Sequence, residues 1–179
     1  MHEYLDRRYA LALYEAAEEK GKAEEYLDEL NEIIKVMQVN EEFLQIVRHP
    51  HLSTSRKKDM FESIFKGRVH DDVLSFILIL IEKNRISNLN GILEEMKKIH
   101  LERNRTVIAY VKTVVPLKDE EKASLKEKLQ KKYNMNVILN EELDKDIIGG
   151  VFVRIGNDVI DGTIKAKFDE IRKLTLKTE

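Results

Sequence analysis

The chain contains no cysteine, and among its 179 residues only two are proline and seven are glycine. Without thiols it can form neither a disulfide nor a thiolate metal site, and a reducing compartment is permitted. So little proline and glycine leaves few of the tight turns that an all-β fold requires. The composition therefore excludes disulfide-stapled domains and argues against turn-rich β-folds.

Long apolar segments are absent as well. The longest apolar run is Phe76–Ile81, which is far short of the roughly 20 residues that a helix needs to cross a bilayer. The first residues, Met1–Arg8, are rich in charge and lack the apolar stretch of a signal peptide. We expect a soluble protein that reaches a membrane only through a partner.

Neither sign of charge predominates. The chain has 31 basic and 33 acidic residues, with a net charge of −2. A nucleic-acid-binding domain would show a basic face and a high pI, and a membrane-surface anchor would show a polybasic cluster. Both classes are therefore disfavoured. Charged residues make up 36% and hydrophobic residues 42% of the chain, which is typical of helix-rich soluble proteins with solvated, ion-paired faces.

The first part of the chain repeats its apolar side chains with the 3.6-residue period of amphipathic helices. Ser53 can cap the start of a fourth helix, Gly67 suits the end of that helix, and Ser87 can cap a sixth. Short connections between amphipathic helices predict a compact bundle. The six expected helices carry their apolar stripes at residues 5–16, 26–37, 43–47, 60–65, 74–81 and 86–99.

Near Thr106 the period changes to two. Residues 106–115 are dense in β-branched side chains and end at Pro116, as a strand would. The other expected elements of this part are a helix over 117–133, strands at 137–139, 151–155 and 159–160, and a last helix from about residue 163.

The change of period predicts an α+β fold with two domains. We expect an N-terminal six-helix bundle over residues 1–105 and a small α/β C-terminal domain over residues 106–179. The first has 17 basic and 20 acidic residues, a net charge of −3, and the second has 14 and 13, a net charge of +1.

No motif for phosphate or cofactor binding is present. A phosphate-binding loop needs Gly-x-x-x-x-Gly-Lys-Ser/Thr, so that backbone amides and a lysine hold the phosphates. The single Gly-Lys pair, Gly21-Lys22, lacks both the upstream glycine and the hydroxyl residue. There is also no Gly-x-Ser-x-Gly nucleophile motif. We expect no catalytic residue and no cofactor.

The titratable residues offer only weak candidates for a site. His49 and His51 have no third ligand nearby, whereas metal sites require three or four. His70 precedes Asp71-Asp72, which could orient it as a base but equally suits a helix N-terminus. The acidic pairs Glu41-Glu42, Glu94-Glu95 and Glu141-Glu142 are expected on polar faces or loops. We expect no metal site.

The expected fifth helix is unusual because it is apolar on two sides. At 100° per residue, one stripe comprises Leu74, Ile77, Leu78 and Ile81, and the other Phe76, Ile79 and Leu80. The first helix has a second stripe at Ala10, Tyr14 and Ala17. Either such a helix is buried all round in the bundle, or one stripe is offered to a partner helix.

Three segments carry motifs that occur together in one family. They are Arg8-Tyr9-Ala10-x-Ala12-Leu13, Glu82-Lys83-Asn84-Arg85-Ile86, and Ile148–Ile164 with its Gly-Gly, polar turn and Asp-Gly. In these segments, and in length and domain order, the chain resembles the delta/oligomycin-sensitivity-conferring subunit family of F-type ATP synthases from end to end. One departure is Arg7-Arg8, where the family often has Arg-Pro.

The resemblance implies a non-catalytic stator subunit of a bacterial ATP synthase, one copy per complex and a monomer when isolated. The helical domain would bind the N-terminal helix of an alpha subunit between its first and fifth helices, and the C-terminal domain would bind the C-termini of the b subunits. This joint would resist rotor torque at the cytoplasmic face of the plasma membrane. The expected groove residues are Leu5, Tyr9, Ala12, Leu13, Phe76, Ile79, Leu80 and Lys83.

The C-terminal signature is expected to be mainly structural. Its glycines permit positive φ or close backbone approach, its polar turn suits a hairpin, and its aspartate can cap the last helix or stabilise it by charge. The residues concerned are Gly149, Gly150, Arg154, Gly156, Asp161 and Gly162.

Two other classes of function remain as alternatives. A helical RNA-binding or antitermination-type factor would need a basic face, against which the net charge of −3 argues. An enzyme with an unrecognised site would need convergent titratable groups in a pocket, and the sequence shows none.

Overall fold

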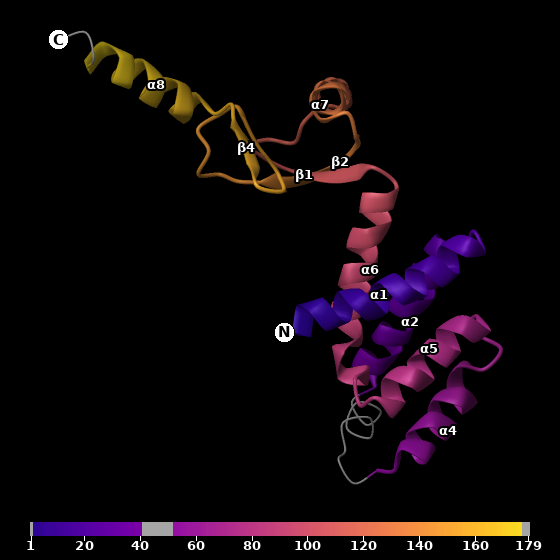
Figure 1. The fold of residues 1–179 in the computed structure, drawn as a ribbon. Helices are drawn as coiled ribbons and strands as arrows, with labels where there is room; N and C mark the ends of the chain where they lie inside the picture. The colour runs from indigo at the N-terminus through magenta and orange to yellow at the C-terminus, as the bar shows by residue number, and fades with distance from the viewer. Residues whose placement is uncertain (1, 41–51, 177–179) are drawn as a thin grey trace. The chain divides into compact units, whose positions relative to one another are not determined.

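In a computed structural model, residues 2–40 and 52–176 are described, and the chain divides into two compact units, Met1–His100 and Leu101–Glu179 (Figure 1). The division falls inside a helix rather than at residue 105, since the last helix of the first unit continues to Arg103. Each unit has its own cluster of buried side chains.

The secondary-structure elements of the first unit are all helices among its described residues, apart from an isolated bridge between Lys66 and Val69. The expected third helix, with Phe43, Leu44 and Val47, lies outside those residues, as do His49, His51, Glu41 and Glu42, so a six-helix bundle is not established. The described elements are α1 (His2–Glu19), α2 (Ala23–Val39), α4 (Thr54–Phe65), α5 (Asp71–Glu82), the 3₁₀ turn η1 (Ile86–Asn88) and α6 (Leu89–Arg103).

Helix ends follow the expected chemistry in two of three places. Ser53 is the N-cap of α4 and its hydroxyl accepts a hydrogen bond from the Arg56 amide at 3.4 Å. Gly67 follows the end of that helix with a φ of +75°. The prediction for Ser87 was wrong, because Ser87 lies inside η1 and α6 begins after it.

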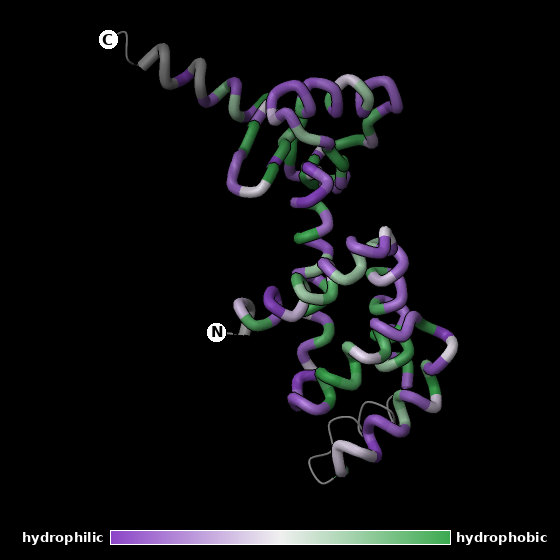
Figure 2. Tube along the Cα trace, turned by 45° about the vertical axis from the view of Figure 1, so that its right-hand side comes forward, coloured by the Kyte–Doolittle hydropathy of each residue, from purple (hydrophilic) through white to green (hydrophobic). Residues whose placement is uncertain are grey.

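The core of the first unit is built from all of its described helices. Hydrophobic residues recur between hydrophilic ones along these helices, as amphipathic packing requires (Figure 2). The largest fully buried side chains of this core are Tyr26, Phe61, Leu30, Ile33, Ile77, Leu80, Leu89, Ile92, Met96 and Val73.

The second unit has the expected β-α-β-β-β-α order. The second strand was expected at 137–139, which is too short. The observed strand runs from Asn136 to Leu143 and pairs in parallel with the first strand over all eight residues. The first strand ends at Thr113, before the expected Val115. The elements are β1 (Thr106–Thr113), α7 (Asp119–Tyr133), β2 (Asn136–Leu143), β3 (Val151–Ile155), β4 (Asp158–Asp161) and α8 (Ile164–Leu176).

The four strands form one sheet in the order β2-β1-β3-β4, in which only β1 and β2 are parallel. One face packs against α7 through Leu129, which is buried with Val111 and Val137. Because side chains alternate along a strand, the intervening residues point to the opposite face. We call this opposite face the outer face, and it carries Ile108, Tyr110, Lys112, Ile138, Glu142, Phe152, Arg154, Val159 and Asp161.

Candidate functional site

The predicted groove lies between α1 and α5, and the structure places its residues at three depths. Leu13, Phe76 and Leu80 are buried, Leu5 and Tyr9 are half-buried, and Ala12, Ile79 and Lys83 are exposed. Of the two alternatives for α5, burial therefore applies to Phe76 and Leu80, although both were expected to line the groove. The reason is that α5 packs against α1, α2 and α4 together, which covers most of its circumference.

Helices α1 and α5 contact each other through aromatic side chains. The rings of Tyr9 and Phe76 pack at a centroid distance of 6.4 Å in a T-shaped arrangement. The guanidinium of Arg85 lies over the Tyr9 ring, 5.4 Å from its centroid. Sequence analysis did not assign Arg85 to the groove, although it lies in the Glu82–Ile86 motif.

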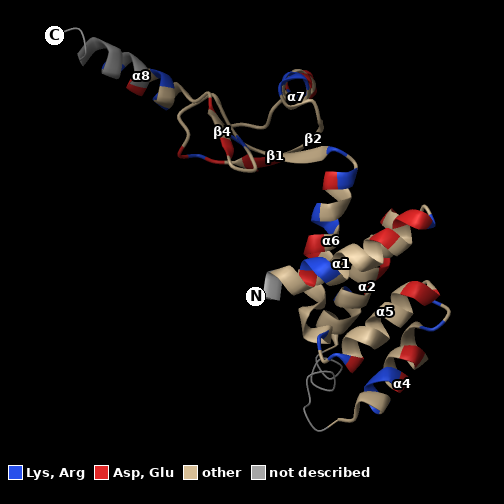
Figure 3. Ribbon diagram, viewed as in Figure 1, with Lys and Arg blue, Asp and Glu red and all other residues tan. Residues whose placement is uncertain are grey.

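Five of the expected groove residues keep exposed or half-buried side chains. We call them the α1–α5 surface, and they are Leu5, Tyr9, Ala12, Ile79 and Lys83. Ile79 stands out in it, since its side chain is 48% exposed on a helix whose other large apolar residues are buried or half-buried. Charged residues are confined to the two ends of α5 (Figure 3). A narrow apolar strip bounded by charge suits one side of an amphipathic helix.

One end of this surface is closed by a polar cluster around Asp72. Lys20 at the end of α1 and Tyr26 on α2 both donate hydrogen bonds to the Asp72 carboxylate, each at 2.5 Å. These bonds lower the pKa of Asp72 below its ordinary 3.8, and the bond from Lys20 has the larger effect. Burial and the bond to Asp72 raise the pKa of Tyr26 to about 12. The cluster ties α1 and α2 to the start of α5, so it holds the two sides of the surface in place.

His70 has a structural role, in which it connects the start of α5 to α2. Asp71 and Asp72 lie in the first turn of α5, as the capping interpretation expects. The carboxylates that face His70 are instead those of two residues of α2, with a Glu29 oxygen 2.6 Å from Nδ1 and a Glu25 oxygen 3.2 Å from Nε2. Glu29 also accepts from the His70 backbone amide at 2.9 Å. Among the described residues, no group of three or more His, Cys, Asp or Glu is placed to hold a metal ion.

Of the acidic pairs Glu94-Glu95 and Glu141-Glu142, one member departs clearly from the expected polar face or loop, since Glu94 is exposed but Glu95 is not. Glu95 is buried rather than on a polar face, because Arg7 of α1 reaches it at 3.4 Å and Lys98 at 2.5 Å. A buried carboxylate needs such partners. Glu141 and Glu142 lie in β2, where Glu142 is exposed and pairs with Lys112, and Glu141 is half-buried and pairs with Lys122.

The C-terminal signature is held together by backbone contacts. Gly150 has a φ of +89°, and a Cβ there would overlap the Gly162 carbonyl oxygen. The Gly162 amide donates to the Val151 carbonyl at 3.0 Å, and the Ile164 amide donates to the Gly149 carbonyl at 2.9 Å. These contacts fix the start of α8 beside the start of β3.

The other signature residues also have local partners or local geometry. The Asp161 carboxylate accepts a hydrogen bond from the Thr163 amide at 3.0 Å, which lowers the Asp161 pKa. Thr163 in turn accepts from the Ala166 amide in the first turn of α8. Gly156 turns the β3–β4 hairpin with a φ of +56°. Arg154 lies over the Tyr110 ring, 5.3 Å from its centroid.

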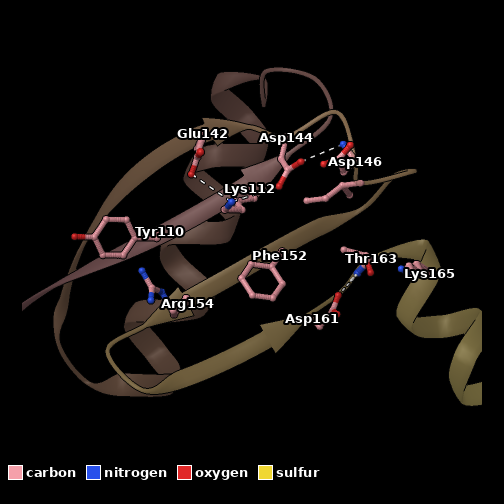
Figure 4. A pocket seen from close by; sticks show the side chains of 11 residues that line it. Tyr110, Lys112, Glu142, Asp144, Asp146, Phe152, Arg154, Asp161, Thr163 and Lys165 are labelled. Atoms are coloured by element: carbon pink, nitrogen blue, oxygen red, sulfur yellow. Dashed lines mark hydrogen bonds and ion pairs between the residues drawn. The ribbon is translucent and has the colours of Figure 1, made fainter.

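The outer face of the sheet contains a hollow that sequence analysis did not anticipate. It has a volume of about 590 Å³ and is open to solvent. Tyr110 and Arg154 flank one side, Phe152 lies between the strands, and Asp144 and Lys165 lie toward the other side (Figure 4). The available signal was the alternation along β1, where Ile108, Tyr110 and Lys112 share one face.

The fold and the surfaces can now be set beside known proteins. The family model for the ATP synthase delta (OSCP) subunit matches residues 5–174. The protein called ATP synthase subunit delta in Clostridium perfringens is 54% identical over 179 residues, which cover all of both chains. Its counterpart in Clostridium kluyveri is 55% identical over 100% of this chain and 99% of that relative.

A solved structure shows the same fold. A chain in the cryo-EM structure of the Toxoplasma gondii mitochondrial ATP synthase hexamer is 18% identical, with a TM-score of 0.61 over 96% of this chain and 97% of that chain. In the part of the chain that the structure describes, no helix is both long and apolar enough to cross a membrane. Because the family model and the Clostridium relatives match this sequence essentially from end to end, the chain belongs to the ATP synthase delta (OSCP) subunit family.

Proposed function

We propose that this chain is a non-catalytic connector in the peripheral stalk of an F-type ATP synthase. Its helical unit binds the N-terminal helix of an alpha subunit at the α1–α5 surface, and its C-terminal unit binds the b subunits. One copy, monomeric when isolated, joins the catalytic head to the stalk at the cytoplasmic face of a bacterial plasma membrane. The support is membership of the delta (OSCP) family along the whole chain.

The observation that carries the alpha-subunit assignment is Ile79. A large apolar side chain that is 48% exposed loses its contact with water when a partner helix covers it, with a gain of about 25 cal/mol per Å² of apolar area buried. Tyr9 and Ala12 on α1 extend the apolar strip, and Lys83 supplies a charged edge. Costs of association reduce this gain, so affinity depends on how well one helix fills the strip.

The proposal is tested by calorimetric titration of the full chain with a synthetic peptide of the alpha-subunit N-terminus encoded by the same genome. The decisive variant is Ile79→Asp. Val36→Asp is the matched control, since Val36 is 44% exposed on α2, outside the α1–α5 surface. Circular dichroism checks that both variants are folded.

We expect saturable one-to-one binding by the wild type and by Val36→Asp, and no measurable binding by Ile79→Asp. Peptide binding that survives in Ile79→Asp would remove the alpha-subunit site from α5. If the wild type binds no peptide, the helical unit does not serve as the receptor.

A further inference from the structure

Within the C-terminal unit, no described helix packs on the outer face of the sheet. Tyr110 is 43% exposed and Ile138 is 49% exposed on this face, and Phe152 is half-buried in its hollow. The sheet combines one parallel pair with two antiparallel pairs, and a sheet with antiparallel strands can leave one face open. Among the described residues of this unit, α7 packs on the opposite face, so the outer face is available to a partner.

Helix α8 does not fold back over the outer face, because its start is fixed beside the start of β3. The Ile164 amide donates to Gly149, Thr163 caps the first turn, and Asp161 binds the Thr163 amide. Folding α8 back over the sheet would break these bonds. Its own apolar side is also open, since Phe168 is 67% exposed.

The sheet and α8 present neighbouring parts of one surface. Lys165 lines the hollow of the outer face, and Phe168 lies three residues further along the same helix, where side chains are neighbours. A partner lying in the hollow can therefore continue onto Phe168. Strands extend a sheet at its edges, whereas helices pack on its faces, so a helix fits this surface.

The charges on the face indicate what that helix carries. Lys112 is already paired with Glu142 at 3.5 Å and with Asp144 at 3.3 Å. Arg154 contacts the Tyr110 ring but has no carboxylate within ion-pairing distance among the described residues. The hollow combines the apolar side chains of Tyr110, Ile147 and Phe152 with charged residues around them. An arginine that lies on an aromatic ring at the edge of such a hollow is suited to pair with an incoming carboxylate.

We propose that the outer face and Phe168 together bind an amphipathic helix whose apolar stripe fills the hollow and whose flanking carboxylate pairs with Arg154. The inference rests on the proposed function, under which this helix is the C-terminal segment of a b subunit. It adds to that function the face that is used and the chemistry of the helix that fits it.

The test measures binding of the full chain to the soluble C-terminal half of the b subunit from the same genome. Two variants alter the outer face, Ile138→Lys and Arg154→Glu. Two matched controls make the same kind of change at exposed positions of the same unit that do not belong to the outer face: Val115→Lys, where Val115 is 65% exposed, and Lys126→Glu on α7. Circular dichroism compares the folded state of all four.

Each face variant is expected to weaken binding by about tenfold or more, as loss of a central interface contact does, while both controls bind as the wild type does. If the wild type binds and all four variants bind equally well, the outer face is not the site, although the connector role stands. If the wild type fails to bind the b segment while binding the alpha peptide, the C-terminal half of the proposed function fails, and this inference fails with it. A dimer of the chain that Ile138→Lys dissociates would assign the face to a second copy and contradict the proposal.

Discussion

Single glycines in the C-terminal signature differ in what they do, and the difference is visible at the level of atoms. Gly150 combines a φ of +89° with close contact to the Gly162 carbonyl, whereas Gly156, at a φ of +56°, has open space where a Cβ would stand. Gly150 is required both for its positive φ and for the lack of space for a Cβ, whereas Gly156 is required only for its positive φ. Substitutions at the two should therefore differ in cost.

We predict that Gly150→Ala lowers the free energy of unfolding by about 1–3 kcal/mol, because it adds steric overlap to an unfavourable φ. Gly156→Asn should cost less than about 1 kcal/mol, since asparagine tolerates the left-handed region. Urea unfolding followed by circular dichroism measures both. Equal losses at the two positions would show that close packing at Gly150 is unimportant.

Asp72 makes stability depend on pH. Its pKa in the folded protein lies below the ordinary 3.8, because of the hydrogen bonds from Lys20 and Tyr26. A carboxyl with a lowered folded pKa stabilises the fold above its unfolded pKa, and this contribution is lost as the pH falls through the folded value. The variant Asp72→Asn should therefore be less stable than the wild type at pH 7, with a difference that shrinks as the pH falls below 3.8.

Urea unfolding at a series of pH values tests this, with Asp71→Asn as the control. Asp71 lies in the same first turn of α5 but outside the bonded cluster. A difference between Asp72→Asn and the wild type that stays constant across the pH series would contradict the assigned role.

Residue chemistry could be predicted from sequence where it is local. The turn role of Gly156 follows from residue type and neighbours alone. The expected cap at Asp161 was wrong, because the Thr163 hydroxyl caps the first turn of α8 while Asp161 binds the Thr163 amide. The burial of Glu95 could not be predicted, because its partner Arg7 is on another helix, distant in sequence. An acid on a helix is ordinarily solvated, and only the contact between α1 and α6 makes this one an exception.

At the scale of elements, α5 shows the same limit. Its two apolar stripes correctly indicated an unusual helix, but periodicity cannot decide which neighbour covers which stripe. The structure buries Leu80 completely and leaves Ile79, one residue earlier, 48% exposed. The length of β2 was similarly underestimated, because it is set by pairing with β1 rather than by the number of β-branched residues in the strand.

We predict that Leu80→Ala lowers the free energy of unfolding by about 2–5 kcal/mol, as truncation of a fully buried leucine does. Ile79→Ala should cost less than about 1 kcal/mol, because it removes a side chain that is already half in water. Urea unfolding of the two variants provides the comparison. A loss at Ile79 as large as that at Leu80 would mean that the α1–α5 surface is part of the core.

At the scale of the molecule, the two units have separate buried cores, and Leu80 belongs to one while Val153 belongs to the other. Sites that share no partners act independently on stability. We predict that Leu80→Ala lowers the unfolding midpoint of the first unit only, and that Val153→Ala lowers that of the second only. Hydrogen exchange measured by mass spectrometry reports each unit separately, and a loss of protection in both units from either variant would contradict their independence.

The division into two units gives the proposed connector two independent binding surfaces, and the central claim is that one molecule uses both at once. The most direct measurement is sedimentation of the full chain with the alpha-subunit peptide and the soluble b segment together. We predict a ternary complex that contains one copy of this chain, loses the peptide in Ile79→Asp and loses the b segment in Ile138→Lys. Binding of the two partners only in alternation, never together, would contradict a connector.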